Sequence, residues 1–336
     1  MPVFESDSKS IMPLSATRRE IDATYTLLRQ LDQSWVNLFS KCRIDIYELR
    51  QIILVGSGDS WAVALTAAAW IENNSTLNCV ARQTFEFLNI DLHRYARETL
   101  VVVISASGRP SLVTDALKHA INSQVQVLGL TNNSSSPFSK LTENMLLSGA
   151  QKNGMPTQST SATLYLLLRL VDMINVTSPR LDHFTSICRT NFSQIQREWL
   201  QTERNMYREK KITFLGNHVT WGLAIAGTNL LSCGPQIRTD AFLVEEFHHS
   251  LRLNQVSEGE HFILLPGSQA EHKFYLQTQS ALLQKNASVD IIDIKPECTP
   301  VTHLFYVLQY LYEMSWHLAV DFIEQGGRRV YHQENT

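Results

Sequence analysis

The 336-residue chain has no uninterrupted apolar run of about 18 residues, so no membrane-spanning helix is expected. It also has no excess of positive charge: 29 lysines and arginines stand against 32 aspartates and glutamates, a formal net charge of −3. Nucleic acid is therefore disfavoured as a partner. Residues 1–20 carry mixed charges without an apolar run, so no signal peptide is predicted.

Cysteine is scarce, and its spacing fits neither a disulfide framework nor a metal site. The five cysteines are odd in number and scattered: Cys42, Cys79, Cys188, Cys233 and Cys298. This usage predicts a cytoplasmic protein with mostly buried thiols and no bound metal. A dinucleotide cofactor is not expected either, because Trp61 stands where the third glycine of a G-x-G-x-x-G turn would follow Gly56 and Gly58.

The length is generous for one domain and comfortable for two, and 44% hydrophobic residues are ordinary for a globular protein. Residues 1–16 resemble a flexible leader, and the apolar spacing over 17–41 predicts a helix. The predicted organisation is an N-terminal leader and helix (1–45), a first domain (46–178), a connecting helix (179–209), a second domain (210–325) and a tail (326–336).

A strand followed by a hydroxyl-rich turn is the most informative local pattern. Residues 101–104 are Val-Val-Val-Ile, typical of a strand buried on both faces. Ser105, Ser107 and Gly108 follow, and a helical pattern begins at Leu112. Small hydroxyls and a glycine before a helix N-terminus favour a phosphate group, through backbone N–H donors and the helix dipole.

The same device recurs twice in the first half of the chain. Gly56, Ser57 and Gly58 separate a strand at 51–55 from a helix at 61–72, and residues 154–161 precede a helix at 162–174. Alternating strands and helices predict an α/β fold with a parallel sheet and helices on both faces. Ligands bind such sheets beyond the carboxyl ends of the strands, where all three turns should lie.

The second half echoes the first with a period of about 160 residues. Residues 211–218 echo the first strand and turn, 261–265 echo 100–104, and 302–322 echo the helix at 162–174. The repeat indicates a duplicated domain. The second copy has lost most of the hydroxyls, so the first copy is predicted to hold the phosphate.

Five short motifs in order resemble the double sugar-isomerase-domain (SIS) family, which includes the isomerase half of glucosamine-6-phosphate synthase and deglycases of phosphorylated Amadori sugars. Val55–Gly58 resembles its Cys-Gly-Thr-Ser turn, and Phe85–Phe87 its Ser-Glu-Phe. Ser105–Gly108 is similar to its Ser-Gln-Ser-Gly phosphate loop. Gly154–Gln158 is similar to its Val-Ala-Ser-Thr-Lys, and Glu245–His249 to its Glu-x-x-His-Gly-Pro.

The resemblance implies two tandem flavodoxin-like SIS domains in a homodimer or higher homo-oligomer with a shared site. It implies a sugar 6-phosphate as the ligand and proton transfer between C1 and C2 through an enediol. The implied substrate-binding residues are Gly56, Ser57, Gly58, Ser105, Ser107, Gly108, Ser111 and Thr157. His249 is the implied acid or ring-opening group, often reaching across the dimer interface, and Glu246 is expected to orient it.

One departure leaves two functions open. The family's base glutamate lies sixteen residues before the histidine, and that position is Cys233 here. Asp240 and Glu245 are weaker replacements. The chain is thus expected to be either a phosphosugar isomerase or deglycase, or a non-catalytic phosphosugar sensor or regulator.

Overall fold

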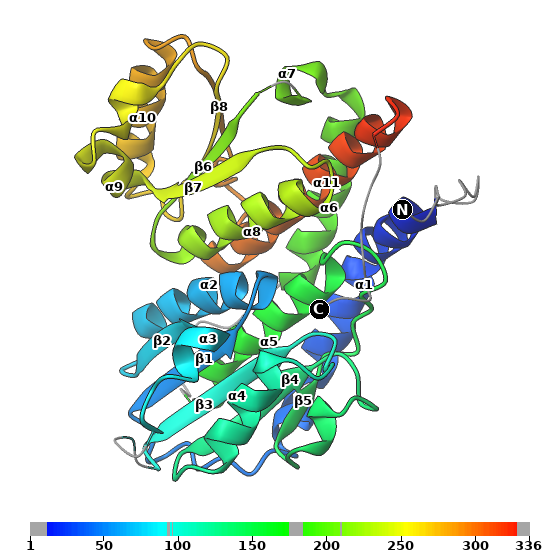
Figure 1. Cartoon of the computed structure of the whole chain (residues 1–336), viewed down its shortest axis with the longest axis vertical. Coiled ribbons are helices and arrows are strands. Elements are labelled where there is room, and N and C mark those ends of the chain that lie inside the picture. Colours follow the sequence, from blue (N-terminus) through cyan, green and yellow to red (C-terminus); the bar gives the residue numbers. More distant parts are fainter. Residues whose placement is uncertain (1–11, 93–94, 96, 175–183, 209, 328–336) are drawn as a thin grey trace, which may run out of the picture.

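The computed structural model describes residues 12–327 apart from 93–94, 96, 175–183 and 209, and it contains two parallel sheets that lie one above the other in Figure 1. The first sheet has the strand order β2-β1-β3-β4-β5. Its strands are β1 (Gln51–Gly56), β2 (Asn78–Gln83), β3 (Thr99–Ser105), β4 (Gln126–Thr131) and β5 (Met145–Leu147). All seven residues of β3 are buried, as its unbroken apolar run predicts.

Helices cover both faces of the first sheet. They are α2 (Asp59–Asn74), α3 (Thr84–Phe87), α4 (Leu112–Ile121) and α5 (Gln158–Ile174), and a 3-10 turn spans Phe138–Lys140. Alternate residues of β3 point to opposite sides: Val102 packs in the core with α2 and α5, and Val101 packs in the core with α4.

The second sheet repeats the first four strands. Its order is β7-β6-β8-β9, which matches β2-β1-β3-β4 of the first sheet. Corresponding strands lie about 160 residues apart in the chain. The strands are β6 (Ile212–Gly216), β7 (Thr239–Leu243), β8 (His261–Leu265) and β9 (Ser288–Ile291). The accompanying helices are α8 (Trp221–Cys233), α9 (Val244–His249), α10 (His272–Leu283) and α11 (Pro300–Glu324), with 3-10 turns at His218–Thr220 and Arg252–Gln255. The predicted duplication and fold class are confirmed: two tandem flavodoxin-like α/β units, each built on a parallel sheet.

The two units meet through α2 and α8, which lie side by side between the sheets (Figure 1). The contact is so close that a Cβ added at Gly222 would lie 2.0 Å from the carbonyl oxygen of Ala62. The small residues of α2 therefore serve a helix–helix contact as well as packing on the sheet.

Two further helices, α1 (Met12–Phe39) and α6 (Phe184–Gln201), join the units. The N-terminal α1 packs against both α5 and α11. α6 packs against α11, and the short α7 (Asn205–Arg208) follows it. No helix in the described part of the chain is long and apolar enough to span a membrane.

Three expected helix boundaries were wrong. α1 begins at Met12, so residues 12–16 of the expected leader are helical, and residues 1–11 lie outside the described ranges. α5 begins at Gln158 instead of residue 162, which puts the hydroxyls of 159–161 in its first turn. The connecting helix, expected over 179–209, ends at Gln201. The domain boundaries proposed from the sequence stay predictions.

Candidate functional site

The first component of the site is the turn between β1 and α2. Gly58 has a φ of 56°, which favours glycine, and it precedes α2 without a side-chain cap. The Ser57 hydroxyl donates to Thr84 Oγ1 at 2.7 Å, which ties this turn to the start of α3. Ser57 and Gly58 are exposed, and Asp59 is the first residue of α2.

The second component is the loop between β3 and α4. Ser105 Oγ accepts a hydrogen bond from the N–H of Gly108 at 3.2 Å, and Ser107 Oγ accepts one from the N–H of Arg109 at 3.4 Å. Gly108 has a φ of 64° and packs so tightly on Ser136 that a Cβ would reach 2.2 Å from its hydroxyl oxygen. The loop is therefore pre-formed around its serines, and Ser111 follows it as the N-cap position of α4, with no side-chain cap bond.

The third component is the segment between β5 and α5, which α1 holds in place. Glu20, which is 2% exposed, accepts hydrogen bonds from the backbone N–H groups of Asn153 at 2.5 Å and Gly154 at 3.3 Å. Thr17 Oγ1 accepts another from the N–H of Met155 at 3.0 Å. α1 thereby fixes the segment that carries Lys152 to the site.

The three components meet in one polar pocket at the carboxyl end of the first sheet. Ala106 contributes the edge of the β3–α4 loop, and the polar lining is formed by Ser57, Asp59, Ser60, Lys152, Ser159, Thr160 and Thr163. The pocket thus brings together hydroxyls, one ammonium group and one carboxyl group, at the place where open α/β sheets bind ligands.

The predicted substrate-binding residues are distributed unevenly around this pocket. Ser57 lines it directly, whereas Ser105, Ser107, Gly108 and Ser111 belong to the loop that reaches it through Ala106. Gly56 and Gly58 flank Ser57 in the same turn.

Thr157 is fully buried, and its hydroxyl has no hydrogen-bond partner in the described structure. Ser159 and Thr160, which follow it in the chain, line the pocket, whereas Thr157 does not.

The carboxyl group in the pocket is Asp59, which sequence analysis did not single out. Asn229 of α8 donates its Nδ2–H to Asp59 Oδ1 at 3.1 Å, so the second unit reaches into the site of the first. Although part of the residue surface is accessible, the carboxyl group is surrounded by protein, and burial raises its pKa. Hydrogen bonding to Asn229 and the charge of Lys152 act in the opposite direction.

The predicted catalytic pair lies elsewhere in the chain. Glu246 and His249 are both exposed on α9, which follows β7 in the second unit, and neither lines the polar pocket. The adjacent His248 faces Thr278 Oγ1 at 2.9 Å, in keeping with a structural role. Cys233, the last residue of α8, is half-buried and does not line the pocket; Asn229 stands one turn before it.

The other two carboxylates considered as replacements for the base do not line the pocket. Asp240 forms an ion pair with Lys211 at 2.8 Å, and Glu245 is exposed on α9. No group of three or more histidine, cysteine, aspartate or glutamate side chains suited to a metal ion occurs within the described ranges.

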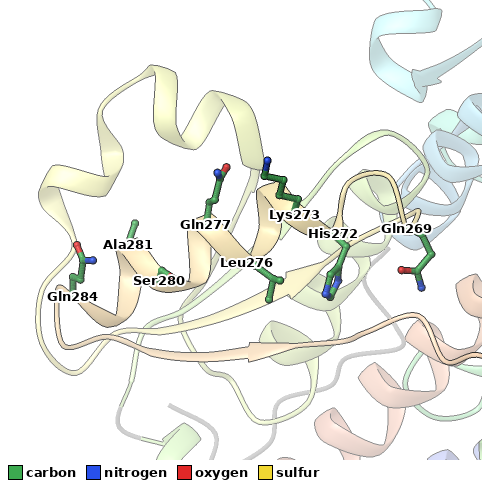
Figure 2. Close-up of a pocket in the computed structure, with 8 residues that line it drawn as sticks. All are labelled: Gln269, His272, Lys273, Leu276, Gln277, Ser280, Ala281 and Gln284. Carbon is green, nitrogen blue, oxygen red and sulfur yellow. The ribbon is translucent and has the colours of Figure 1, made fainter.

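A second, wider pocket runs along the outer face of α10 (Figure 2). Its lining comes from that helix and the residue Gln269 before it, with Lys273 and Gln277 on one side and Leu276 and His272 on the other. Because it is a shallow surface along one helix and contains no hydroxyl-rich turn, it is a weaker candidate.

Comparison with known proteins agrees with the fold. Residues 45–173 match the family model of the SIS domain. The search of curated proteins found no match.

Solved structures match over nearly the whole chain. A glucosamine-6-phosphate deaminase from Thermotoga maritima aligns with a TM-score of 0.78 and 18% identity, over 93% of this chain and 96% of that one. The C-terminal domain of a glucosamine-fructose-6-phosphate aminotransferase from Francisella tularensis gives 0.72 and 16%, over 94% and 96%. A tagatose-6-phosphate ketose/aldose isomerase from Escherichia coli gives 0.72 and 15%, over 95% and 97%. At these identities the likeness shows the fold.

Proposed function

We propose that this protein binds a sugar 6-phosphate at the polar pocket of the first unit, whose volume of about 30 Å³ admits one small group of the ligand, and transfers a proton between C1 and C2 of the sugar, as an aldose/ketose isomerase or a deglycase of an Amadori adduct. The observation that carries the proposal is the meeting of three hydroxyl-rich segments and Lys152 in one pocket at the carboxyl end of the first sheet. The proteins of similar fold named above are called a phosphosugar deaminase, aminotransferase and isomerase.

The phosphate is proposed to bind between the β3–α4 loop and the start of α5. The start of α4 has no side-chain cap, so its first N–H groups are available to an anion, and the helix dipole favours negative charge there. Ser105 and Ser107 supply hydroxyls, and Lys152 supplies a positive charge. Phosphate fits this donor set, because it presents several acceptor oxygens and negative charge.

The site is proposed to be completed by a second copy of the chain. Glu246 and His249 are exposed on α9 and available to a neighbouring molecule. In a homodimer with a shared site, His249 would act as the acid on the sugar ring and Glu246 would orient it, as the resemblance implies.

A non-catalytic phosphosugar sensor is the alternative. It is favoured by Cys233, which stands where the resemblance implies the base, and which lies outside the pocket lining. Such a protein would bind the same ligand through the same loop without moving a proton.

A thermal-shift screen tests the phosphate site. Fructose 6-phosphate, glucosamine 6-phosphate, tagatose 6-phosphate and an O6-phosphorylated Amadori adduct are compared on the wild type, Ser105→Ala and the exposed control Ser193→Ala. A ligand at 100 times its Kd stabilises the folded state by about 2.7 kcal/mol.

We expect a shift with at least one phosphosugar that Ser193→Ala keeps and Ser105→Ala loses, and no shift with the unphosphorylated sugar. No shift with any of the four, or an equal shift in both variants, would contradict the proposed site.

A further inference from the structure

The pocket contains a carboxyl group whose position differs from every candidate that the motifs suggest. Asp59 is the one acidic residue among the described residues that line the pocket. It follows the Gly56–Gly58 turn directly, so its carboxyl group stands beside the proposed sugar site on the first helical turn of α2. A base must lie within reach of the proton that it removes, and Asp59 meets that geometric requirement better than Asp240 or Glu245.

The second unit holds this carboxyl group in place. Asn229 Nδ2 donates to Asp59 Oδ1 at 3.1 Å. The contact depends on the close packing of α2 on α8, where Gly222 meets Ala62. α8 therefore orients a carboxylate that belongs to α2, and carries Cys233 at its own end.

The surroundings of Asp59 shift the pKa of its carboxyl group in opposing directions. Burial is the largest influence on Asp59 and raises its pKa, while Asn229 and Lys152 lower it. Tyr312 is the other titratable group that interacts with it, and its own pKa is raised by burial. An ionised carboxylate whose pKa is raised is a stronger base than an ordinary surface aspartate.

We propose that Asp59 is the base that carries the proton between C1 and C2, oriented by Asn229 as a positioning residue; this inference rests on the proposed function. Asp59 removes the C2 proton of the open-chain aldose, the C–H electron pair forms the C1–C2 double bond, and O1 takes the proton of the neighbouring O2 hydroxyl. Asp59 then returns its proton to C1, and the electrons on O2 form the C2 carbonyl.

The position of Asp59 also orients the ligand. A phosphate beside the carboxylate at the start of α2 would meet a like charge, whereas the uncapped start of α4 carries no acidic residue before Asp115. The phosphate therefore lies toward the β3–α4 loop, and the reactive C1–C2 end lies toward Asp59.

The test is deuterium exchange at C1 and C2 of the same phosphosugars, followed by NMR in D2O, together with their binding constants. Asp59→Asn is nearly isosteric and keeps an oxygen for Asn229 to donate to. Glu72→Gln, at the far end of α2, is the matched control: Glu72 Oε1 accepts from the N–H of Cys79, which a glutamine oxygen also accepts.

We expect Asp59→Asn to bind within about threefold of the wild type and to lose about 10²- to 10⁴-fold in exchange rate, the usual contribution of a general base. Glu72→Gln keeps both properties. Exchange in Asp59→Asn within threefold of the wild type would overturn the assignment. If the wild type binds a phosphosugar but exchanges no proton, the assignment of Asp59 as a base is wrong and the sensor function is favoured. If the wild type binds no phosphosugar, the proposed function is wrong as well.

A second variant keeps the inference testable if Asp59→Asn does not fold. Asn229→Ala removes the hydrogen bond that lowers the pKa of Asp59, so the acid limb of the pH–exchange profile should move to higher pH. Loss of rate without movement of that limb would mean that Asn229 acts only on packing, and would overturn its positioning role and the assignment of the limb to Asp59.

Discussion

The clamp between α1 and the β5–α5 segment gives a sharp prediction for stability and binding together. Glu20 accepts the N–H groups of Asn153 and Gly154 from a nearly fully buried position. In Glu20→Ala both N–H groups lose this acceptor. Asn153 is exposed and can turn to water, but Gly154 is buried. A buried donor left without a partner costs about 1–3 kcal/mol, and more when the lost acceptor is charged.

We therefore expect Glu20→Ala to lower the free energy of unfolding by about 2–3 kcal/mol. Glu20→Gln keeps an acceptor oxygen of the same reach, and burial already raises the pKa of Glu20, so a neutral side chain costs about 1 kcal/mol or less. Gln33→Ala, an exposed change on the same helix, should stay within about 0.5 kcal/mol of the wild type.

Urea unfolding monitored by circular dichroism measures these differences, and phosphosugar binding is measured on the same preparations. Because the clamp fixes the segment that carries Lys152, Glu20→Ala should also weaken phosphosugar binding more than Glu20→Gln does. Equal stability of the alanine and glutamine variants would refute the clamp, and unchanged binding in Glu20→Ala would refute its connection to the site.

Two further predictions concern the buried polar groups of α11. His303 is fully buried with Nε2 on the carbonyl oxygen of Pro266 at 2.9 Å, and burial lowers its pKa from 6.5 to about 4. The unfolded chain therefore binds a proton at this histidine more readily than the folded chain, so the free energy of unfolding should fall by about 3 kcal/mol as the pH drops from about 6.5 to 4. In His303→Gln the urea midpoint should fall less steeply over this range. Parallel plots of urea midpoint against pH for the variant and the wild type would contradict this. Arg18 pairs with the fully buried Glu313 at 2.6 Å, so Arg18→Ala should cost about 3–5 kcal/mol by leaving that charge uncompensated. Adding Glu313→Gln should recover part of the loss, and no recovery in urea unfolding would argue against the uncompensated charge.

The strands could be predicted because a parallel strand that is buried on both faces consists of an unbroken run of apolar residues. β3 contains the whole Val-Val-Val-Ile run, and all of its residues are buried. The period of about 160 residues then predicted the strands of the second sheet, and the same strand order recurs there.

Helix ends were harder to place because local polar residues compete with the helix for backbone hydrogen bonds. The Gln-Ser-Thr-Ser sequence at the start of α5 predicts a loop, since such residues favour caps and turns. In the fold, Gln158 reaches back to accept the N–H of Gln151, and the helix begins there. This contact joins two residues across a loop, and helical periodicity does not reveal it.

The position of the candidate site could be predicted from the sequence, but its charged groups could not. The turn at Ser57 and the segment after Gly154 converge as the strand–helix pattern indicates. Asp59 escaped notice because an acidic residue in a first helical turn is ordinary, being favoured by the helix dipole. Its partner Asn229 is 170 residues away, and the contact exists only because α2 packs on α8.

Glu246 and His249 illustrate a different difficulty. Their motif marks a short helix after β7, and α9 does form there. Their part in a site depends on a second copy of the chain, which neither the sequence nor one folded chain specifies. Both assignments stay predictions.

The most direct test of the central claim is a crystal structure of the protein with a bound sugar 6-phosphate. We expect phosphate density within about 3 Å of donors in the Ser105–Ser111 loop, the hydrogen-bonding range, with the C1–C2 end of the sugar facing Asp59. Phosphate bound in the second unit instead, beside residues 266–268 or along α10, would contradict it.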